Sequence, residues 1–368
     1  MWHWHWVVDF FSTAQHGDFL AGWVCAVISI GLAKFIFRVL FSRLFSSARH
    51  NDGNDDKLYG LDHAILNLDP PETMWMNMGY WDHARTFPDA CVALLRKVLE
   101  AADLLDEDGY PVQREDRQSL RLVDVGFGCG DQTLYLTQQL SKPDIHDAPP
   151  RPLFDSYIGI TLNPHQAEFA RQRLQAEPSI EQTTGTRTPD IRIFCADAGN
   201  PASWNDDLHR ALSSAQRGKK DPKDTGAWLL ALDTLYHFKP SRRPLFSYAY
   251  ENRISIMAFD LLLSDSASLY GRMVLRLVCL VASIPSSNFM TPSEYKKLLT
   301  QSGYAVERIA MEDISERVFP GLAGYMQSKE KELGRFGMTL GKYRVPAKIF
   351  AWWARSGIVR GMLVVAKR

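Results

Sequence analysis

The stretch L-V-D-V-G-F-G-C-G-D-Q-T, residues 122–133, decides the fold. A short apolar segment ends in three glycines spaced G-x-G-x-G, and a helix-like segment follows them. Glycines at such a turn let the backbone approach a ligand closely, and the start of the following helix offers free N–H groups. A strand, a glycine-rich turn and a helix in this order indicate a cofactor-binding α/β domain.

Strand-like and helix-like segments alternate on either side of this turn. The alternation predicts an α/β fold, a Rossmann-like seven-stranded, mostly parallel sheet with an antiparallel last strand and helices on both faces. The predicted strands cover residues 120–125, 156–162, 191–196, 227–233, 273–280, 304–311 and 361–366. The predicted helices cover residues 88–105, 131–140, 164–175, 243–264 and 292–302.

The segment between the last two predicted strands, residues 312–358, is helical in pattern, basic and aromatic, and we expect it to form a helical lid. Its portion 343–360 reads Y-R-V-P-A-K-I-F-A-W-W-A-R-S-G-I-V-R. Three interpretations of this portion stay open: a lid, an amphipathic helix that faces a membrane, and a core helix with basic ends.

Composition excludes several broad classes. The chain has 368 residues, of which 46% are hydrophobic and 23% charged, as in a folded globular protein. Its 42 basic and 42 acidic side chains balance, which argues against a general nucleic-acid binder. The five cysteines show no metal-type spacing, so we expect no metal site and a reducing compartment.

The N-terminus is the compositional outlier. Residues 19–41 read F-L-A-G-W-V-C-A-V-I-S-I-G-L-A-K-F-I-F-R-V-L-F, just long enough to span a bilayer. Trp and Phe precede this run and the positive charges follow it, which orients the rest of the chain toward the cytosol. The alternatives are a buried core helix and an interfacial helix.

These observations predict three parts. Residues 1–45 are a membrane anchor with a transmembrane helix at 19–41, residues 46–57 are a polar linker, and residues 58–368 are the catalytic domain. The predicted protein is therefore a single-pass membrane protein with its catalytic domain facing the cytosol, at the endoplasmic reticulum or a similar membrane.

The glycine turn points to a particular cofactor. Its spacing is not the G-x-G-x-x-G of dinucleotide folds, and Asp131 at the start of the helix would repel a phosphate. The second strand ends in Thr161-Leu162-Asn163, without the acid that usually holds a ribose. A cofactor with an ammonium group and no phosphate fits better, which favours S-adenosylmethionine (SAM) over a nicotinamide.

Four further stretches carry a family resemblance. Residues 159–166, G-I-T-L-N-P-H-Q, are similar to a G-[IV]-[TN]-[LI]-S-x-x-Q segment, with Asn163 in place of Ser. Residues 76–81 contain a G-Y-W segment, residues 232–238 read L-D-T-L-Y-H-F, and residues 361–367 resemble a last antiparallel strand. From about residue 70 to the end, the chain resembles the class I SAM-dependent methyltransferases, in the branch of sterol and tocopherol methyltransferases and cyclopropane fatty-acid synthases.

The resemblance implies a site. The cofactor-binding residues that it implies are Tyr80, Trp81, Asp124, Gly126, Gly128, Gly130, Thr161, Leu162, Gln166, Asp197, Ala198 and Asp233. In the family the acid at the position of Asp197 meets the adenine amino group. Tyr80 and Trp81 either cover the sulfonium through cation–π contact or form a core aromatic pair.

His237 and Tyr236 are the predicted catalytic residues. His237 is either a general base or a structural histidine, and Tyr236 either contacts the substrate or packs. Cyclopropane synthases carry a glutamate at the position of Tyr236 that helps to hold bicarbonate, so its replacement favours plain methyl transfer.

The predicted function is SAM-dependent methyl transfer to a lipid or other hydrophobic small molecule at a membrane. Two alternatives stay open: a natural-product O-, N- or C-methyltransferase, and a catalytically silent methyltransferase fold used as a binding module. The oligomeric state is left open by the sequence.

Overall fold

The computed structural model describes residues 68–112, 119–142, 151–176, 189–217, 225–282 and 284–368. All of these residues belong to one compact unit, Leu61–Arg368. The predicted transmembrane helix at 19–41 and the predicted linker at 46–57 lie outside the described residues.

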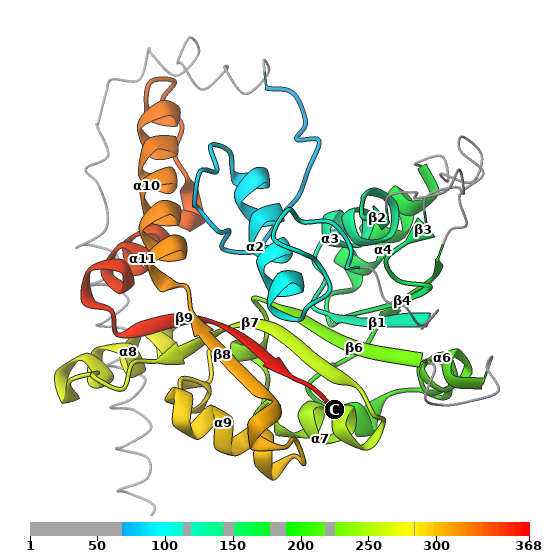
Figure 1. The fold of residues 1–368 in the computed structure, drawn as a ribbon. Helices are drawn as coiled ribbons and strands as arrows, with labels where there is room; N and C mark the ends of the chain where they lie inside the picture. Colours follow the sequence, from blue (N-terminus) through cyan, green and yellow to red (C-terminus); the bar gives the residue numbers. More distant parts are fainter. Residues whose placement is uncertain (1–67, 113–118, 143–150, 177–188, 218–224, 283) are drawn as a thin grey trace, which may run out of the picture. The chain divides into compact units, whose positions relative to one another are not determined.

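A seven-stranded sheet forms the centre of this unit (Figure 1), in the order β5-β4-β1-β6-β7-β9-β8. Every neighbouring pair is parallel except the two that involve β9, which runs antiparallel to β7 and to β8. The predicted mostly parallel sheet with an antiparallel last strand is therefore confirmed. The strands are β1 (Ser119–Val125), β4 (Ser156–Thr161), β5 (Asp190–Cys195), β6 (Thr225–Leu232), β7 (Ser255–Leu263), β8 (Ile309–Asp313) and β9 (Val359–Ala366). A separate two-stranded sheet joins β2 (Ser141–Lys142) and β3 (Arg151–Pro152).

Helices cover both faces of the sheet, as predicted. One face carries α2, α10 and α11, and the other carries α6, α7 and α9 (Figure 1). The helices are α2 (Phe87–Ala101), α3 (Asp131–Leu134), α4 (Pro164–Ala176), α6 (Asp206–Arg217), α7 (Arg243–Glu251), α8 (Leu269–Ala282), α9 (Pro292–Gln301), α10 (Ser315–Gly334) and α11 (Arg344–Ser356). A π-helical turn, Tyr135–Gln139, extends α3, and short 3-10 turns cover Pro201–Ser203, Leu235–His237, Ser286–Asn288, Val306–Arg308 and Gly341–Tyr343.

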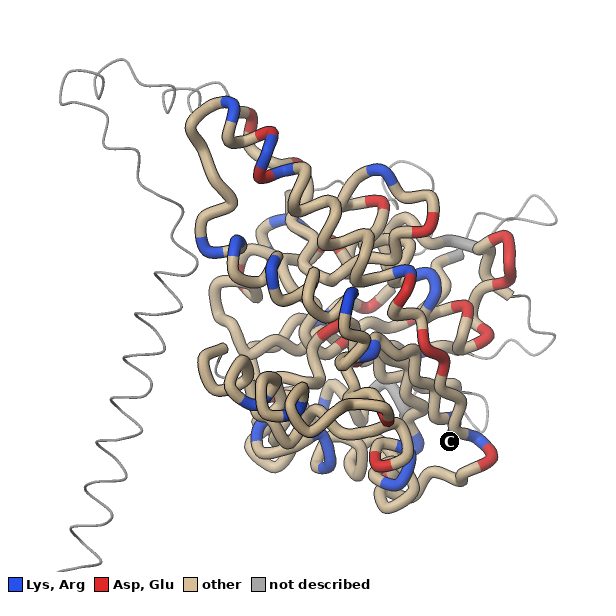
Figure 2. Tube along the Cα trace, turned by 90° about the vertical axis from the view of Figure 1, so that its left-hand side faces the viewer, with Lys and Arg blue, Asp and Glu red and all other residues tan. Residues whose placement is uncertain are grey.

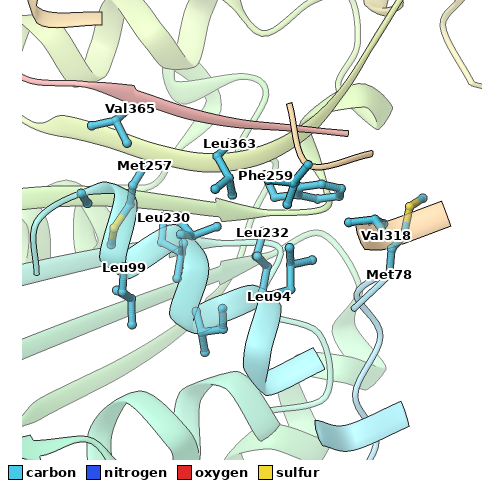
Figure 3. Packing of buried hydrophobic residues seen from close by; sticks show 14 of the residues in the cluster. Met78, Leu94, Leu99, Leu230, Leu232, Met257, Phe259, Val318, Leu363 and Val365 are labelled. Carbon is cyan, nitrogen blue, oxygen red and sulfur yellow. The ribbon is translucent and has the colours of Figure 1, made fainter. Parts of the chain in front are cut away.

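Alternation along the central strands divides the core into two layers. Leu230 and Leu232 of β6 point toward α2, together with Met257 and Phe259 of β7 (Figure 3). The residues between them belong to the layer on the opposite face, such as Ala231. Side chains of a strand alternate between faces, so two interleaved apolar sets can each be buried by helices.

The helix predicted at 243–264 is wrong in its second half, where the chain forms a strand. α7 ends at Glu251, and Arg253 then takes a left-handed φ of 57°. β7 follows and is buried along almost its whole length. A strand that is covered on both faces reads as an unbroken apolar run, which periodicity does not distinguish from a buried helix.

The strand predicted at 273–280 is also wrong, because this segment belongs to α8. Its valines favour a strand by propensity, but tertiary packing overrides that preference. The hydroxyl of Ser268 accepts the Gly271 N–H at 3.1 Å near the start of the helix. Leu275 and Cys279, four residues apart, are its buried side chains. The sheet keeps seven strands because β7 takes the place of this predicted one.

Two helices, α10 and α11, fill most of the range predicted as a lid and pack against one another. Trp353 of α11 is buried, with its ring 5.7 Å from that of Phe319 in α10. Within the described ranges, no helix is long and apolar enough to span a membrane.

Candidate functional site

A cavity of about 590 Å³ lies at the carboxyl ends of the central strands. Segments that follow four neighbouring strands contribute to its wall. Gly126 to Cys129 follow β1, Thr161 to Asn163 end β4, Asp197 and Ala198 follow β5, and Leu232 to Lys239 end β6. The edge where a parallel sheet presents its loops is the usual ligand site of this kind of fold.

Ten of the fourteen residues predicted for the site line this cavity, and four do not. The ten are Gly126, Gly128, Thr161, Leu162, Gln166, Asp197, Ala198, Asp233, Tyr236 and His237. The other four are Tyr80, Trp81, Asp124 and Gly130.

The three glycines of the turn all have positive φ, from 71° to 97°, which favours glycine. They meet different neighbours. A Cβ on Gly126 would lie 2.5 Å from Oγ1 of Thr234, and one on Gly130 would lie 3.0 Å from Cβ of Ala170 in α4. Gly126 therefore lets the turn approach the end of β6, and Gly130 lets it approach a helix.

Asp124 lies beneath the turn, fully buried. The side-chain amide of Gln132 donates to both of its oxygens at 2.7 and 2.8 Å, and the Tyr157 hydroxyl donates to Oδ2 at 2.7 Å. Burial raises its pKa to about 7, against the effect of these donors. The carboxyl thus ties the end of β1 to the start of α3, without lining the cavity.

The loop after β4 holds the stretch that lacks a ribose-binding acid. The Thr161 hydroxyl donates to Oε1 of Gln166 at 3.0 Å, so the two side chains brace each other. The side-chain oxygen of Asn163 accepts the backbone N–H of His165 at 2.9 Å. This bond caps α4, a role that Ser and Asn share, and it explains why Asn163 fits where the branch often has Ser.

Asp197 lies in the next segment of the wall, just after β5. Its Oδ1 accepts the Gly199 N–H at 2.8 Å, and its backbone oxygen accepts from the Trp204 indole at 2.7 Å. These contacts pin the loop after β5 at the cavity.

Asp131 does not leave an uncompensated negative charge at the start of α3. Nη1 of Arg173, from α4, lies 2.7 Å from its Oδ2, and the Met74 N–H donates to the same oxygen at 3.1 Å. The expectation that Asp131 would repel a phosphate did not take Arg173 into account, which the fold places beside Asp131. The glycine spacing stays as the sequence argument against a dinucleotide.

The segment at residues 74–77 was missed as part of the site and crosses the cavity. Sδ of Met76 lies 3.4 Å from Nε2 of Gln166, and a Cβ on Gly128 would lie 3.5 Å from that sulfur. The G-Y-W resemblance had pointed to the right region but to residues slightly too far along the chain. Other lining residues absent from the predicted site are Met74, Trp75, Asn77, Phe127, Cys129, Asp131, Gln132, Ile160, Asn163, Leu232, Thr234, Phe238 and Lys239.

Trp81 packs away from the cavity, against α10. Its backbone N–H donates to the Arg317 carbonyl at 2.7 Å, and its ring lies 5.1 Å from that of Tyr325. A Cβ on Gly321 would fall on its side chain at 2.1 Å. The residue before it, Tyr80, has Nζ of Lys97 at 5.7 Å from its ring centroid. Both side chains are half-buried, and neither lines the cavity.

Asp233 lies in the wall of the cavity, and one of its carboxyl oxygens has no hydrogen-bond partner among the described residues. The Tyr236 side chain and the Met78 backbone bond its carboxyl, yet its buried Oδ1 has no hydrogen-bond partner among the described residues. Burial raises its pKa to about 8. Its φ of 61° is in the left-handed region, a strained backbone of the kind found at functional sites.

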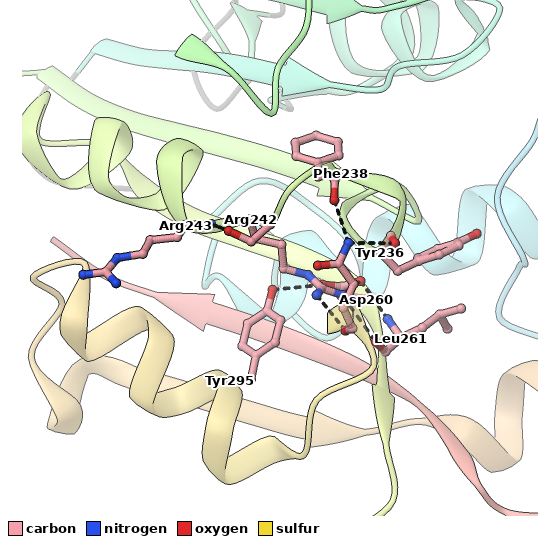
Figure 4. A network of polar contacts seen from close by, with 9 residues as sticks. Tyr236, Phe238, Arg242, Arg243, Asp260, Leu261 and Tyr295 are labelled. Carbon is pink, nitrogen blue, oxygen red and sulfur yellow. Dashed lines mark hydrogen bonds and ion pairs between the residues drawn. The ribbon is translucent and has the colours of Figure 1, made fainter. Parts of the chain in front are cut away.

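Behind the Tyr236–His237 loop lies a buried ion pair (Figure 4). Nε of Arg242 donates to Oδ2 of Asp260 at 2.6 Å and Nη2 donates to Oδ1 at 3.0 Å, both side chains being fully buried. The Tyr295 hydroxyl donates to Oδ2 at 3.0 Å. The backbone N–H of Leu261 in β7 donates to Oδ1 at 2.8 Å, so each oxygen of the carboxylate accepts two hydrogen bonds.

Asn288 connects this pair to the loop. Nη1 of Arg242 donates to its backbone oxygen at 2.7 Å. Its side-chain amide donates to the carbonyls of Tyr236 and Phe238 at 3.0 and 2.7 Å (Figure 4). The loop that carries the two predicted catalytic residues is thus held in place by hydrogen bonds from the Asn288 side chain to the loop backbone.

His237 lies at the rim of the cavity, with its ring 4.1 Å from that of Tyr236. Partial desolvation lowers the pKa of the imidazole, against the opposing charge of Asp260. Burial raises the pKa of Tyr236 well above its ordinary value. At neutral pH the histidine is therefore uncharged and able to accept a proton, and the phenol keeps its own.

Solved structures with this fold include the mycolic acid cyclopropane synthase CmaA1 complexed with SAH and CTAB. It superimposes with a TM-score of 0.52 and 14% identity, over 83% of this chain and 94% of that chain. The cyclopropane synthase MmaA2 from Mycobacterium tuberculosis has a TM-score of 0.49 and 13% identity, over 87% of this chain and 100% of that chain.

A third similar structure is geranyl diphosphate C-methyltransferase from Streptomyces coelicolor A3(2), complexed with Mg2+, geranyl diphosphate and S-adenosyl-L-homocysteine. Its TM-score is 0.47 at 13% identity, over 90% of this chain and 97% of that chain. No protein-family model matches the sequence, and no curated protein matches it.

The chain therefore has the fold of the class I SAM-dependent methyltransferases. The resemblance to the cyclopropane-synthase branch, which the sequence motifs carried, is confirmed for the fold.

Proposed function

We propose that this chain transfers a methyl group from SAM to a lipid or another hydrophobic small molecule at a membrane. The observation that carries the proposal is the cavity at the carboxyl edge of the sheet, built on the glycine turn and containing the unpartnered Oδ1 of Asp233. A buried acceptor without a donor costs free energy, and an ammonium group of a ligand would relieve that cost.

The residues of the cavity fit SAM. Asp233 would accept from the ammonium of its methionine part, and Asp197 from the amino group of its adenine. Thr161 and Gln166 would meet the ribose through neutral hydrogen bonds, which are weaker than bonds to a carboxylate. When bound, SAM supplies an electrophilic methyl group.

The remaining task of the protein is to align the methyl acceptor and to exclude water. Aromatic side chains in the wall, including Trp75, Phe127 and Phe238, favour an apolar acceptor. His237, uncharged at neutral pH, would accept the proton of an acceptor that loses one. The Tyr236 phenol, bonded to Asp233, would shape the space beside the methyl group.

The membrane location in this proposal comes from the apolar run at residues 19–41, which we propose as a single-pass anchor with the catalytic domain in the cytosol. An acceptor that partitions into the bilayer would then be available to the cavity at high local concentration.

The test uses the full chain and SAM with an isotopically labelled methyl group. The chain is incubated with a lipid extract and, separately, with a water-soluble extract, and the label is followed by mass spectrometry. Transfer into the lipid fraction supports the proposal, and transfer confined to water-soluble products favours the natural-product alternative. Absence of both SAM binding and transfer refutes methyl transfer and favours the catalytically silent binding module.

His237→Ala separates chemistry from binding. If His237 is a base, the variant loses transfer while its affinity for SAM in calorimetry stays unchanged. A structural histidine would instead alter both measurements, or neither.

A further inference from the structure

α8 presents an apolar stripe to solvent on one side of the molecule. Leu269, Tyr270 and Met273 are 83%, 77% and 63% exposed. We call these three residues, with Leu277, Leu280 and Val281, the α8 stripe, all of them exposed. Six large apolar side chains on successive turns of one helix form a contiguous patch, which on a soluble surface marks an interaction site.

The helix that carries the stripe is firmly attached by its opposite face. Leu275 and Cys279 are buried in the core cluster that also contains Phe289 and Trp353. A Cβ on Gly271 would lie 2.6 Å from Cδ1 of Ile358, so the start of α8 rests directly on the segment before β9. The stripe is therefore a fixed surface, held outward by packing on the other side.

Beside the stripe lies a second cavity, of about 530 Å³, between α8 and α9. Its wall contains Arg272 and Arg276 of α8 and Lys297 of α9. None of these three cations forms a salt bridge within the part of the chain that the structure describes.

One acid, Glu294, also lines the second cavity, and it is already engaged. Its Oε2 accepts the backbone N–H of Thr291 at 2.8 Å and the hydroxyl of the same residue at 3.0 Å, which caps α9. The uncharged polar residues of the wall are Ser286, Ser287 and Gln301. Three cations and one acid leave an excess of positive charge in a chain whose overall charge is zero.

We propose that α8 and the second cavity form a docking surface for a bilayer of anionic phospholipid. The α8 stripe would enter the boundary between headgroups and acyl chains, and Arg272, Arg276 and Lys297 would meet the phosphate of a headgroup. α8 itself carries two arginines and no acidic residue, the charge pattern of an interfacial helix. Figure 2 presents the side of the molecule on which α8, α10 and α11 lie in Figure 1.

The charges distinguish a bilayer from a second copy of the chain. In a symmetric contact between two α8 stripes, Arg272 and Arg276 of one copy would face the same residues of the other, and like charges would repel. An anionic headgroup instead complements them.

The docking surface is also close to the first cavity. Phe289 lines the second cavity, and its ring lies 6.4 Å from that of Tyr236, which lines the first. One aromatic ring thus stands between the proposed lipid surface and the candidate site.

The test measures amide hydrogen exchange of α8 in the full chain, mixed with lipid nanodiscs. The discs contain phosphatidylcholine alone or phosphatidylcholine with phosphatidylglycerol, and no SAM is added, so the result is independent of the proposed methyl transfer. We expect exchange across Leu269–Ala282 to slow severalfold more on the anionic discs. An anchor at 19–41 would tether the chain to either disc, so the difference reports on α8 itself.

Two double variants and a control complete the experiment. Arg272→Gln with Arg276→Gln should weaken the anionic preference by about fivefold for each arginine, and Met273→Asp with Leu277→Asp should remove the protection. Val306→Asp alters an exposed apolar residue outside α8 and should leave the protection intact. Circular dichroism verifies that each variant is folded.

Three outcomes would overturn the proposal. Equal exchange of α8 on both kinds of disc would exclude anionic recognition, and would be the result if residues 19–41 covered the stripe. Protection that requires two copies of the chain per disc would assign the stripe to a second copy. Protection that survives both double variants would place the lipid contact elsewhere.

Discussion

Two carboxyl groups, one just after β6 and one in the neighbouring strand β7, differ in how completely they are hydrogen-bonded. Asp260 of β7 accepts from Arg242, from the Tyr295 hydroxyl and from the backbone N–H of Leu261. Asp233, which follows β6, has Oδ1 without a partner among the described residues. The two carboxyls are close enough that the charge of Asp260 contributes to raising the pKa of Asp233.

The difference separates a structural site from a ligand site. A fully bonded buried carboxylate leaves nothing for a ligand and stabilises the arrangement around it. A half-bonded one is a cost in the unliganded protein that a donor from outside can remove. Asp124 belongs with Asp260, since it accepts three hydrogen bonds and does not line the cavity.

The largest expected effect comes from breaking the bonded pair. Arg242→Ala leaves the Asp260 charge buried without its cation, and should lower the free energy of unfolding by about 3–5 kcal/mol. Chemical denaturation of the full chain measures it. The neighbouring Arg243 is exposed, so Arg243→Ala is the matched control and should change stability by less than about 0.5 kcal/mol. Equal stability of the two variants would mean that the pair contributes nothing to the fold.

Asp233→Asn should have the opposite profile, with a small effect on folding and a large one on binding. The ammonium group of SAM would favour the ionised form of Asp233, so loss of this charge-assisted hydrogen bond should weaken SAM binding by about 1.5–3 kcal/mol, or roughly 10- to 150-fold in Kd. Isothermal titration calorimetry measures the affinity, and thermal unfolding without SAM measures the stability. An unchanged Kd would show that the free Oδ1 does not await the cofactor.

The same carboxyl predicts a dependence of stability on pH. Burial raises the pKa of Asp233 in the folded chain from 3.8 to about 8, so between these values the folded state holds a proton that the unfolded state has lost. Stability should therefore be greatest at the acid end of this window and fall as pH rises toward 8, by at most about 1.4 kcal/mol per pH unit.

Asp233→Asn should flatten this slope, as followed by the unfolding midpoint in urea from pH 5 to 8. Asp124, with a pKa raised to about 7, adds a similar slope over a narrower range, and Asp124→Asn identifies its share. A slope that survives in the double variant would assign the pH dependence to other groups.

The sequence predicted one half of the sheet better than the other, for a physical reason. The segments from β1 to β6 alternate with polar loops and carry glycine, proline and cap signals, so their order and type followed from local chemistry. β7 and α8 both contain long apolar runs. Only the tertiary structure decides that Phe259 enters a sheet and that Leu277, in a similar run, lies on an exposed helix face.

The candidate site shows the same limit. Ten of the fourteen residues predicted from the motifs line the cavity, because loops after parallel strands must meet at one edge. It did not reveal that Met76 crosses the cavity, that Trp81 packs on α10, or that Arg173 neutralises Asp131. Each of these contacts joins segments far apart in the chain, and none has a local sequence signal.

The side chain of Gln166 is intermediate between Asp260 and Asp233 in how completely it is hydrogen-bonded, and its substitution should have the smallest effect on SAM binding. Its Oε1 accepts from Thr161 at 3.0 Å, whereas its Nε2 has the weak acceptor sulfur of Met76 at 3.4 Å. The amide is therefore half engaged, and Gln166→Ala should weaken SAM binding by about the 1 kcal/mol of one neutral hydrogen bond, roughly fivefold in Kd. Gln172→Ala is the matched control on the same helix, because that side chain is exposed and bonds Glu168. A variant of Gln166 that binds SAM as tightly as the control would mean that the loop after β4 holds the cofactor through its backbone alone.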